Sequence, residues 1–477
     1  MLQELDALEE SIASYEQALA IDPRTPFLLG NCRHARMQVC DWSGFESDKA
    51  AITAALERGE AVATPFVTLS LLDSPALQRR AAEILVGQKL VGTLPFSAPR
   101  HPRHDKIRVG YFSADFRNHA VAMLSAGLFE THDHARFELT AFSLGPNVPD
   151  ELRTRVERTF DRFLQLDGKS ELDIAGLARR LEIDIAVDLG GFTRNARTGV
   201  LALRAAPIQI SYLGYLGSLG GKFIDYLLAD PVLVPSETRD YYGEKIACLP
   251  SYQVNDSNRP IAERAFTRAE LGLPPSGFVF CCFNNTYKIT PETFDSWMRI
   301  LVRAPGSVLF LLGSSPAAVR NLRSEALRRG IAPERIIFGG SLPFAEYLAR
   351  YRSADLFLDT LPYNAGTSAS DALWVGLPVL TLPGQSMASR MAASLLTAAG
   401  LPELIAASRA DYERQAVELA TDAQRLETLK HKLAGNRGRC ALFDTPTFTR
   451  NLESLYQQMY QRHLSGLAPE HLFAAAT

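Results

Sequence analysis

The sequence predicts an α/β protein made of two doubly wound, Rossmann-like domains that follow an α-helical segment. Three observations indicate this fold. Residues 1–100 show helical patterning only, short apolar runs then alternate with amphipathic segments, and a second series of this kind starts near residue 259. Because 477 residues are too many for one hydrophobic core, we expect separate domains at residues 104–258 and 259–477.

The first segment contains one recognisable helical unit. Ser14 to Pro23 reads SYEQALAIDP, which resembles the second helix of a tetratricopeptide repeat that ends at its Asp-Pro pair. Any amphipathic helix that ends at Asp-Pro would look similar. Since a solenoid needs about three repeats, we interpret the unit as the last repeat of an array, docked on the residues that follow. A polar, proline-rich linker is expected at residues 96–105.

Strands and helices alternate in both later segments, which favours a mainly parallel sheet with helices on both faces. The first series of predicted strands comprises Ile107–Ser113, Phe137–Leu144, Ile183–Leu189, Ile208–Leu213 and Ile224–Leu228. The second series comprises Phe278–Phe283, Val308–Gly313, Ile336–Gly339, Leu356–Asp359 and Val379–Leu382. No GxGxxG turn follows the first strand of either series, which argues against a dinucleotide-dependent dehydrogenase.

Composition and charge describe an ordinary globular protein. Hydrophobic residues make up 47% of the chain, charged residues 22%, and the net charge is −3. This balance gives no electrostatic reason to expect nucleic acid or an anionic membrane as a partner. The six cysteines lack metal-ligand spacing, the start of the chain lacks the features of a signal peptide, and no apolar run is long enough to span a bilayer. We therefore expect a cytoplasmic protein.

Residues 355–384 carry the strongest functional signal. The stretch reads as a strand, a turn that contains Gly366, a short helix that opens at Thr367 or Ser368, and a second strand. The exposed N–H groups at the start of such a helix and its dipole favour an anion, most usefully a phosphate. Asp371 lies one turn into the helix, where its carboxylate can accept hydrogen bonds from ribose hydroxyls. Ser368 and Asp371 also have the spacing of an ordinary capping box.

Residues 364–384, NAGTSASDALWVGLPVLTLPG, with Ser389-Arg390 after them, resemble the nucleotide-sugar segment of the O-linked N-acetylglucosamine transferase family. This family of inverting glycosyltransferases includes bacterial members and plant SPINDLY-type proteins. Three other segments resemble it in the same order: DFRNH at residues 115–119, APIQISYLGYLG at 206–217 and FNNTYK at 283–288. The resemblance spans about residues 105–465 and implies the GT-B architecture, with a last helix, residues 448–462, that returns to the first domain.

The FNNTYK segment implies a contact with the diphosphate. Lys288 follows the carboxyl end of a predicted strand, the edge at which doubly wound sheets bind ligands. The resemblance implies that its ammonium neutralises the β-phosphate of a leaving UDP, whereas a solvated loop lysine is the alternative. Asn285 occupies the position of a family glutamine near the diphosphate, and Tyr287 is expected to line the site by packing.

The DFRNH segment carries the candidates for acid–base chemistry. In the family, the residue equivalent to His119 lies where the donor sugar and the acceptor meet. Asp115 is the second candidate, either as a distant base or as the group that orients His119. The family continues with Pro-Thr after this histidine, whereas this chain has Ala120-Val121.

Two segments that contain glycine are expected near the reacting groups. Gly214 and Gly217 belong to a loop whose family counterpart approaches the sugar and phosphate of the donor. Residues 188–193, DLGGFT, end another strand, where Gly190 and Gly191 would let the backbone and the acceptor come close. An ordinary turn after a buried strand is the equal alternative for this pair.

The nucleobase contacts that the resemblance implies differ in part from the family pattern. Tyr347 occupies the position of a histidine that stacks on uracil, and Arg350 would support the base. Phe344 replaces a lysine that contacts ribose, and Gly366 replaces a histidine that precedes the family's Thr-Thr pair. Animal members have a further histidine upstream, in a region where this chain has Thr64-Pro65-Phe66. We interpret these differences as a diverged donor pocket.

The resemblance therefore implies an inverting transfer of a sugar, most naturally N-acetylglucosamine, from a UDP-sugar to Ser or Thr hydroxyls of a protein or peptide. No metal or other cofactor is expected, because no DxD-type motif is evident and Lys288, with the N–H groups of Thr367 and Ser368, could stabilise the leaving diphosphate. Three alternatives stay open: a protein glucosyl- or fucosyltransferase of the same fold, a UDP-sugar epimerase, and a non-catalytic scaffold that contains repeats.

Overall fold

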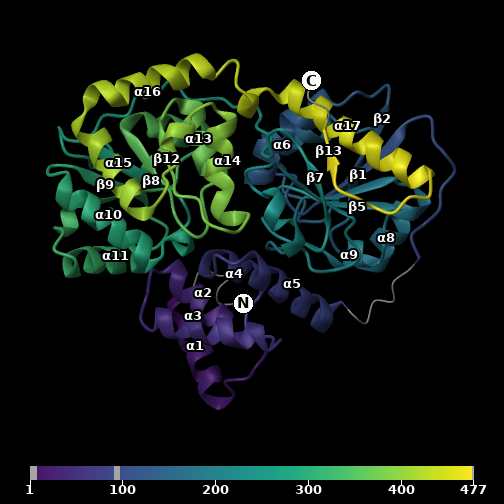
Figure 1. The fold of residues 1–477 in the computed structure, drawn as a ribbon, viewed down its shortest axis with the longest axis horizontal. Helices are drawn as coiled ribbons and strands as arrows, with labels where there is room; N and C mark the ends of the chain where they lie inside the picture. Colours follow the sequence, from purple (N-terminus) through teal and green to yellow (C-terminus); the bar gives the residue numbers. More distant parts are fainter. Residues whose placement is uncertain (1–7, 91–96, 475–477) are drawn as a thin grey trace. The chain divides into compact units, whose positions relative to one another are not determined.

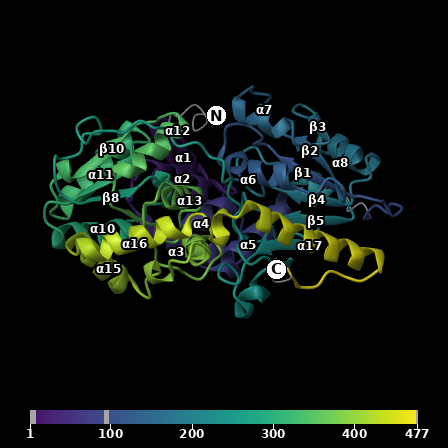
Figure 2. The same ribbon diagram turned by 90° about the horizontal axis from the view of Figure 1, so that it is seen from above.

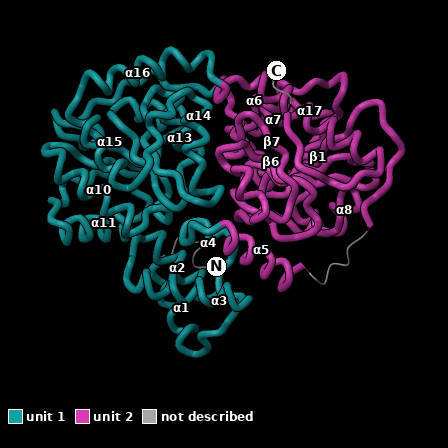
Figure 3. The backbone as a smooth tube through the Cα atoms, in the orientation of Figure 1, with its two compact units in different colours: residues 1–74, 259–440 teal, residues 75–258, 441–477 magenta. Residues whose placement is uncertain are grey.

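The computed structural model of the protein describes residues 8–90 and 97–474. These residues form two compact units, and both units are discontinuous in sequence (Figure 3). Unit 1 takes residues 1–74 and 259–440, and unit 2 takes residues 75–258 and 441–477. Residues 1–7 and 91–96 of the expected helical segment lie outside the described residues, and residue 96 is also the first of the expected linker.

The helical segment opens unit 1 (Figure 1). Its helices are α1 (Leu8–Ile21), α2 (Leu28–Gln38), α3 (Phe45–Glu57) and α4 (Pro65–Leu71). α1 covers most of the repeat-like stretch and ends two residues before Pro23, which lacks the N–H that a helix interior requires. The next helix, α5 (Pro75–Lys89), belongs to unit 2, so the predicted helical region is shared between the two units.

The core of unit 1 is a parallel sheet whose five strands have the order β10-β9-β8-β11-β12. The strands are β8 (Val279–Cys282), β9 (Val308–Leu312), β10 (Ile336–Gly339), β11 (Leu356–Leu358) and β12 (Val379–Leu380). The helices of this part are α10 (Pro291–Arg303), α11 (Pro316–Arg328), α12 (Phe344–Arg350), α13 (Thr367–Val375), α14 (Met391–Ala398), α15 (Arg409–Thr421) and α16 (Ala423–Asn436). All residues of β8 and β11 are buried, as expected for parallel strands that are covered on both faces.

The core of unit 2 is a second parallel sheet, whose eight strands have the order β13-β7-β6-β5-β4-β1-β2-β3. The strands are β1 (Ile107–Ser113), β2 (Phe137–Ser143), β3 (Arg162–Gln165), β4 (Ile185–Asp188), β5 (Ile208–Ser211), β6 (Tyr226–Ala229), β7 (Lys245–Cys248) and β13 (Leu472–Phe473). Its remaining helices are α6 (Ala120–Thr131), α7 (Glu151–Glu157), α8 (Glu171–Arg180), α9 (Gly199–Ala202) and α17 (Thr445–Leu464). The ten strands predicted from the sequence are confirmed, whereas β3, β7 and β13 are absent from that prediction.

The C-terminal residues complete the sheet and helix layer of unit 2. α17 packs on α6 and beside β5, as both ribbon views show (Figures 1 and 2), and β13 pairs with β7. Buried polar contacts accompany this packing. Glu453 Oε1 lies 2.9 Å from His132 Nδ1, and the hydroxyls of Tyr456 and Tyr111 lie 3.1 Å apart. The last helix therefore belongs to the unit that is built mainly from the first half of the chain.

A search of residues 8–90 and 97–474 for membrane spans found no helix with the length and hydropathy that crossing a bilayer requires.

Candidate functional site

In unit 1, two loops at the carboxyl ends of neighbouring strands carry some of the predicted nucleotide-binding residues, among them Asn285 and Lys288. β8 and β11 pair side by side, so the loop at residues 283–289 lies next to the loop at residues 359–366. We call these two loops, with the first turn of α13, the β8/β11 edge. Ligands of doubly wound sheets bind at this kind of edge.

Lys288 links the two loops of the β8/β11 edge. Its Nζ donates a hydrogen bond to the Asn364 carbonyl oxygen at 3.0 Å. Burial lowers the pKa of Lys288 to about 8, while the Asp359 carboxylate nearby acts to raise it. An ammonium has three N–H donors, and Asn364 O is the one hydrogen-bond acceptor recorded for Nζ among the described residues. Lys288 is therefore a partly buried cation whose ammonium is held in one orientation by the hydrogen bond to Asn364.

Asp359 holds the second loop of the edge in shape. Its Oδ1 accepts N–H hydrogen bonds from Thr360 at 2.8 Å and Ala365 at 2.7 Å, and its Oδ2 accepts the Thr381 hydroxyl at 2.6 Å. Burial raises the pKa of Asp359 to about 6, against the lowering effect of these hydrogen bonds and of Lys288. The carboxylate thus closes a ring of contacts at the end of β11.

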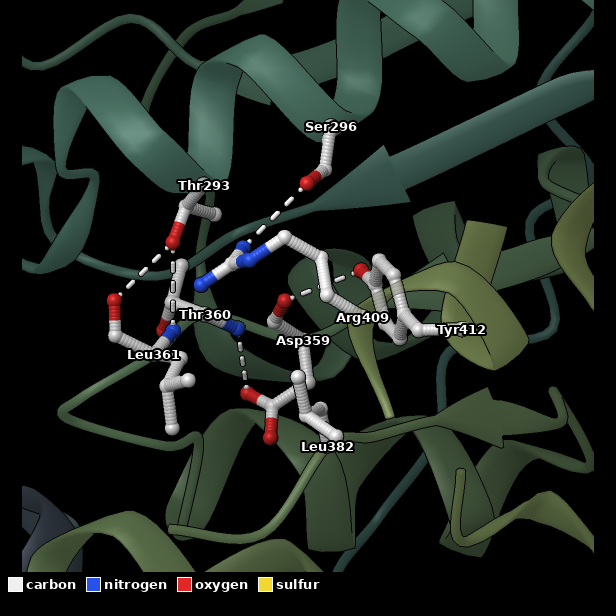
Figure 4. Close-up of a pocket in the computed structure, with 8 residues that line it drawn as sticks. All are labelled: Thr293, Ser296, Asp359, Thr360, Leu361, Leu382, Arg409 and Tyr412. Atoms are coloured by element: carbon white, nitrogen blue, oxygen red, sulfur yellow. Dashed lines mark hydrogen bonds between the residues drawn. The ribbon is translucent and has the colours of Figure 1, made fainter. Parts of the chain in front are cut away.

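Figure 4 shows further contacts of the same loop, around a small cavity. Thr293 Oγ1 donates to the Leu361 carbonyl at 2.9 Å, and the Tyr412 hydroxyl donates to the Asp359 carbonyl at 3.0 Å. These residues line a cavity of about 10 Å³. Such a volume holds at most one water molecule, so this cavity supports the loop and is too small for a nucleotide.

α13 begins at Thr367, and its N-terminal N–H groups lie at the β8/β11 edge. Gly366 is the residue before the helix, and no side chain caps the helix start. The Ser368 hydroxyl hydrogen bonds instead to the Asn284 side chain, and Asn284 Nδ2 donates to Thr360 Oγ1 at 2.9 Å. The capping-box interpretation of Ser368 and Asp371 is therefore wrong. The N–H groups of the first turn have no acceptor within the helix, which suits an anion.

Asp371 forms a buried ion pair. Its Oδ1 contacts Nη1 of Arg259, and both side chains are 2% exposed. Burial raises the pKa of Asp371 to about 6, and Arg259 acts to lower it. Arg259 also lies against the Trp374 ring, 5.6 Å from its centre. A ribose that binds Asp371 would share the carboxylate with this guanidinium.

Tyr347 and Arg350 both belong to α12. The Tyr347 hydroxyl lies 2.7 Å from that of Tyr351, which in turn donates to the Ser368 carbonyl at 3.2 Å. Arg350 is 1% exposed, donates from Nη1 to Gly340 O, and has its guanidinium carbon 4.4 Å from the Phe283 ring centre. Among the described residues, Nε and Nη2 of Arg350 have no hydrogen-bond partner. A buried donor without a partner suits a ligand acceptor, such as a base oxygen.

Sequence reasoning chose Asn285 and missed its neighbour. Asn285 is exposed, whereas Asn284 is buried and connects the β8 loop to α13 through Ser368. No local pattern separates the two asparagines, because both follow the end of β8, a strand that is buried on both faces. A contact between Asn285 and a diphosphate stays a prediction.

The helical segment also contacts the β8/β11 edge within unit 1. The Thr286 hydroxyl donates to the carbonyl of Gln38 at 2.6 Å. Asp73, just after α4, accepts N–H hydrogen bonds from Gln385 and Ser386, both at 2.9 Å, and the Ser389 hydroxyl at 2.6 Å. No local sequence pattern indicates these contacts, because they join residues more than 200 positions apart.

In unit 2, Asp115 and His119 lie together after β1. His119 precedes α6, and its Nδ1 accepts the Val121 N–H at 3.3 Å and lies 3.6 Å from Asp115 Oδ2. Burial lowers the pKa of His119, although Asp115 acts to raise it and Arg117 acts to lower it further. With Nδ1 as acceptor, the neutral ring carries its proton on Nε2. This geometry favours His119 as a hydrogen-bond donor through Nε2, with its ring fixed by the Val121 N–H, over His119 as a base.

Packing and backbone hydrogen bonds within unit 2 explain the glycines at the predicted positions. A Cβ on Gly214 would lie 2.1 Å from the Leu189 carbonyl oxygen, and a Cβ on Gly217 would lie 3.2 Å from the Tyr215 ring. Gly190 and Gly191 donate their N–H groups to Asp188 Oδ1 at 2.9 and 3.1 Å. The backbone itself thus fills the space beside Gly214, and ligand contacts of these glycines stay predictions.

Comparison with known proteins agrees with this geometry. The model of glycosyl transferase family 41 matches residues 76–262 and 255–452. The chain is 34% identical to a probable UDP-N-acetylglucosamine–peptide N-acetylglucosaminyltransferase, SEC, of Arabidopsis thaliana, over 92% of the chain and 47% of that protein. It is 28% identical to the UDP-N-acetylglucosamine–peptide N-acetylglucosaminyltransferase of Caenorhabditis elegans, over 77% of the chain and 42% of that protein.

A solved structure shows the same fold. A mutant of the O-GlcNAc transferase of Thermobaculum terrenum superposes with a TM-score of 0.82 at 28% identity, covering 96% of this chain and 88% of that one. The fold is therefore the GT-B architecture that the sequence predicts. The chain spans less than half the length of the two curated relatives named above. On the family match and the shared fold, the chain belongs to glycosyl transferase family 41.

Proposed function

We propose that the protein is an inverting glycosyltransferase that moves N-acetylglucosamine from UDP-N-acetylglucosamine to Ser or Thr hydroxyls of a protein or peptide. The observation that carries the proposal is the β8/β11 edge, where the Lys288 ammonium and the N-terminal N–H groups of α13 lie on adjacent loops. The names of the relatives supply the sugar and the acceptor class.

The chemistry follows from the charge that develops during transfer. As the acceptor oxygen attacks the anomeric carbon, the bond to UDP breaks and negative charge grows on the β-phosphate. Lys288 and the N–H groups of Thr367 and Ser368 are donors that are already oriented, so they stabilise this charge without reorganisation. Arg350 and Tyr347 would hold the base, and Asp371 the ribose.

The predicted residues of unit 2 serve both the acceptor and the donor sugar in this proposal. His119 would donate a hydrogen bond from Nε2 to the donor or the acceptor, while the Val121 N–H fixes its ring, and Asp115 would act as the distant base. Gly214 and Gly217 would lie along the donor. A cytoplasmic location and independence from metal ions stay predictions.

Titration calorimetry with UDP tests the proposal. Lys288→Ala removes a charge-assisted hydrogen bond of about 1.5–3 kcal/mol and should weaken UDP binding by about 10- to 100-fold. Lys222→Ala, at an exposed lysine of unit 2, is the matched control and should bind UDP like the wild type. Failure of the folded wild type to bind UDP would contradict the proposal and leave the scaffold interpretation.

The sugar is tested with the same protein. UDP-N-acetylglucosamine, UDP-glucose and GDP-fucose are compared as donors, with transfer to a Ser- and Thr-containing peptide library followed by mass spectrometry. A mass gain of one N-acetylhexosamine, dependent on Lys288, is the expected result. Transfer of glucose or fucose instead would identify the alternative transferases.

A further inference from the structure

The Lys288 ammonium lies over an aromatic ring to which the sequence assigned no role. Its Nζ is 3.7 Å from the centre of the Tyr363 ring, on the loop after β11. A cation over a ring face is attracted by the negative charge of that face, and the attraction grows when both partners are shielded from water. Tyr363 is 7% exposed, so this contact is shielded.

Tyr363 belongs to an aromatic cluster to which the helical segment contributes. The cluster consists of His34, Phe66, Tyr287 and Tyr363. The Tyr363 ring centre lies 6.4 Å from that of Phe66 and 6.3 Å from that of Tyr287. Phe66 and Tyr287 are 5.8 Å apart, and His34 lies 5.1 Å from Tyr287. Since Phe66 comes from α4 and His34 from α2, two of these rings belong to the segment before the catalytic domains.

We propose that Tyr363 is a positioning residue for the Lys288 ammonium, and that Phe66 of the helical segment keeps the Tyr363 ring beneath it. The inference rests on the proposed role of Lys288 in UDP binding. It gives the helical segment a second task besides any contact with an acceptor, because this segment shapes the diphosphate site directly.

The ring and Asp359 act on Lys288 in the same direction. Burial lowers the pKa of Lys288 to about 8, and both the Asp359 carboxylate and the Tyr363 ring face favour the charged form. Without the ring, the ammonium would lose its proton at a lower pH. UDP binding that depends on the ammonium would then weaken at a lower pH as well.

The other titratable groups around Lys288 keep one charge state between about pH 7 and about pH 9. Burial raises the pKa of the Cys282 thiol and raises that of Tyr287 to about 12. Burial also lowers the pKa of His34 to about 4, and Asp359, with a pKa of about 6, is ionised throughout this range. UDP itself gains or loses protons near the two ends of this range, so the difference between the pH profiles of a variant and of the wild type is the quantity that reports on Lys288.

The test compares four variants of the full chain by UDP calorimetry from about pH 7 to about pH 9. Tyr363→Leu should weaken UDP binding about 3- to 30-fold at pH 7 and lower the pH at which affinity falls by about 0.5 to 1 unit. Tyr363→Phe retains the ring face and should behave like the wild type. Phe66→Leu should shift the profile in the same direction by less. Tyr241→Leu, at a half-exposed tyrosine of unit 2, is the matched control.

Incorporation of pentafluorophenylalanine at position 363 keeps the ring shape and reverses the charge of its face. This protein needs no repacking, so it tests the inference even where Tyr363→Leu does not fold. Its UDP profile should resemble that of Tyr363→Leu, and a profile like that of Tyr363→Phe would overturn the inference. If Lys288→Ala itself leaves UDP binding intact, the proposed function fails first. If Lys288→Ala weakens binding while the position 363 variants do not, the inference alone fails.

Discussion

We expect the side chain of Asp73 to contribute several kcal/mol to the free energy of unfolding of unit 1. Asp73 lies in the helical segment, far in sequence from the residues of the sheet. Its Oδ1 accepts the N–H groups of Gln385 and Ser386 and the hydroxyl of Ser389. The Gln385 N–H is exposed, and water can replace its partner. The Ser386 N–H and the Ser389 hydroxyl are shielded, so Asp73→Ala should lower the free energy of unfolding by about 2–4 kcal/mol.

The Asn variant separates geometry from charge. Asp73→Asn keeps an acceptor oxygen at the Oδ1 position and should cost less than half as much as Asp73→Ala. The assay is urea unfolding followed by circular dichroism, with the linear slope compared among the three proteins. A loss below about 0.5 kcal/mol for the Ala variant, typical of ordinary surface changes, would refute the reasoning.

Asp73→Ala should also affect the binding of UDP. The loop that Asp73 holds ends near Ala388, whose carbonyl accepts the Asn364 N–H at 3.0 Å, and the Asn364 carbonyl holds Lys288. We therefore expect Asp73→Ala to weaken UDP binding by a few-fold, about 3- to 10-fold, without removing it. Full stability loss with unchanged UDP affinity would show that the two loops are not coupled.

Three further predictions concern the buried charges and the metal. Asp371→Asn removes the ion-pair partner of the buried Arg259 and should lower the free energy of unfolding by about 3–5 kcal/mol in urea, with a loss near zero as the contrary result. Burial raises the pKa of Asp359 to about 6, above its unfolded value, so the stability it contributes is fully present below about pH 4 and is lost as the pH rises toward 6. Between about pH 4 and about pH 6, the free energy of unfolding of Asp359→Asn should change by about 3 kcal/mol less than that of the wild type. If the variant and the wild type have identical unfolding curves at both of these pH values, the prediction is contradicted. Sugar transfer should persist in excess EDTA, because Lys288 and the α13 N–H groups neutralise the diphosphate; loss of activity restored by Mg²⁺ would contradict it.

Most strands of the sheet cores could be predicted from the sequence because they are short runs dominated by apolar residues. β8, for example, is buried along its whole length, and its residues read as an uninterrupted apolar stretch. β13 has two residues and β3 is only partly buried, so neither has a pattern that stands out. Short edge strands are recognised from their pairing, which the sequence does not display.

The site was predictable in its local part and not in its tertiary part. Lys288 and the start of α13 follow from motif and strand-end position, and the structure places both at one edge of the sheet. Asp371 has the spacing of a cap, yet its carboxylate pairs with Arg259, because a buried charge needs a counter-charge more than the helix end needs a cap. The contacts of Phe66 and Asp73 depend on the docking of the helical segment, which no local pattern encodes.

The discontinuity of the two units has a consequence for the order in which the chain is made. Residues 1–74 are synthesised well before the rest of unit 1, which begins at position 259. At about 5–20 residues per second, the wait from residue 74 to residue 290 is roughly 10–40 s. During that time the apolar faces of α2 and α4, which include His34 and Phe66, lack the residues of unit 1 against which they pack. The helical segment of unit 1 therefore becomes native only after the strands that it packs beside have been synthesised.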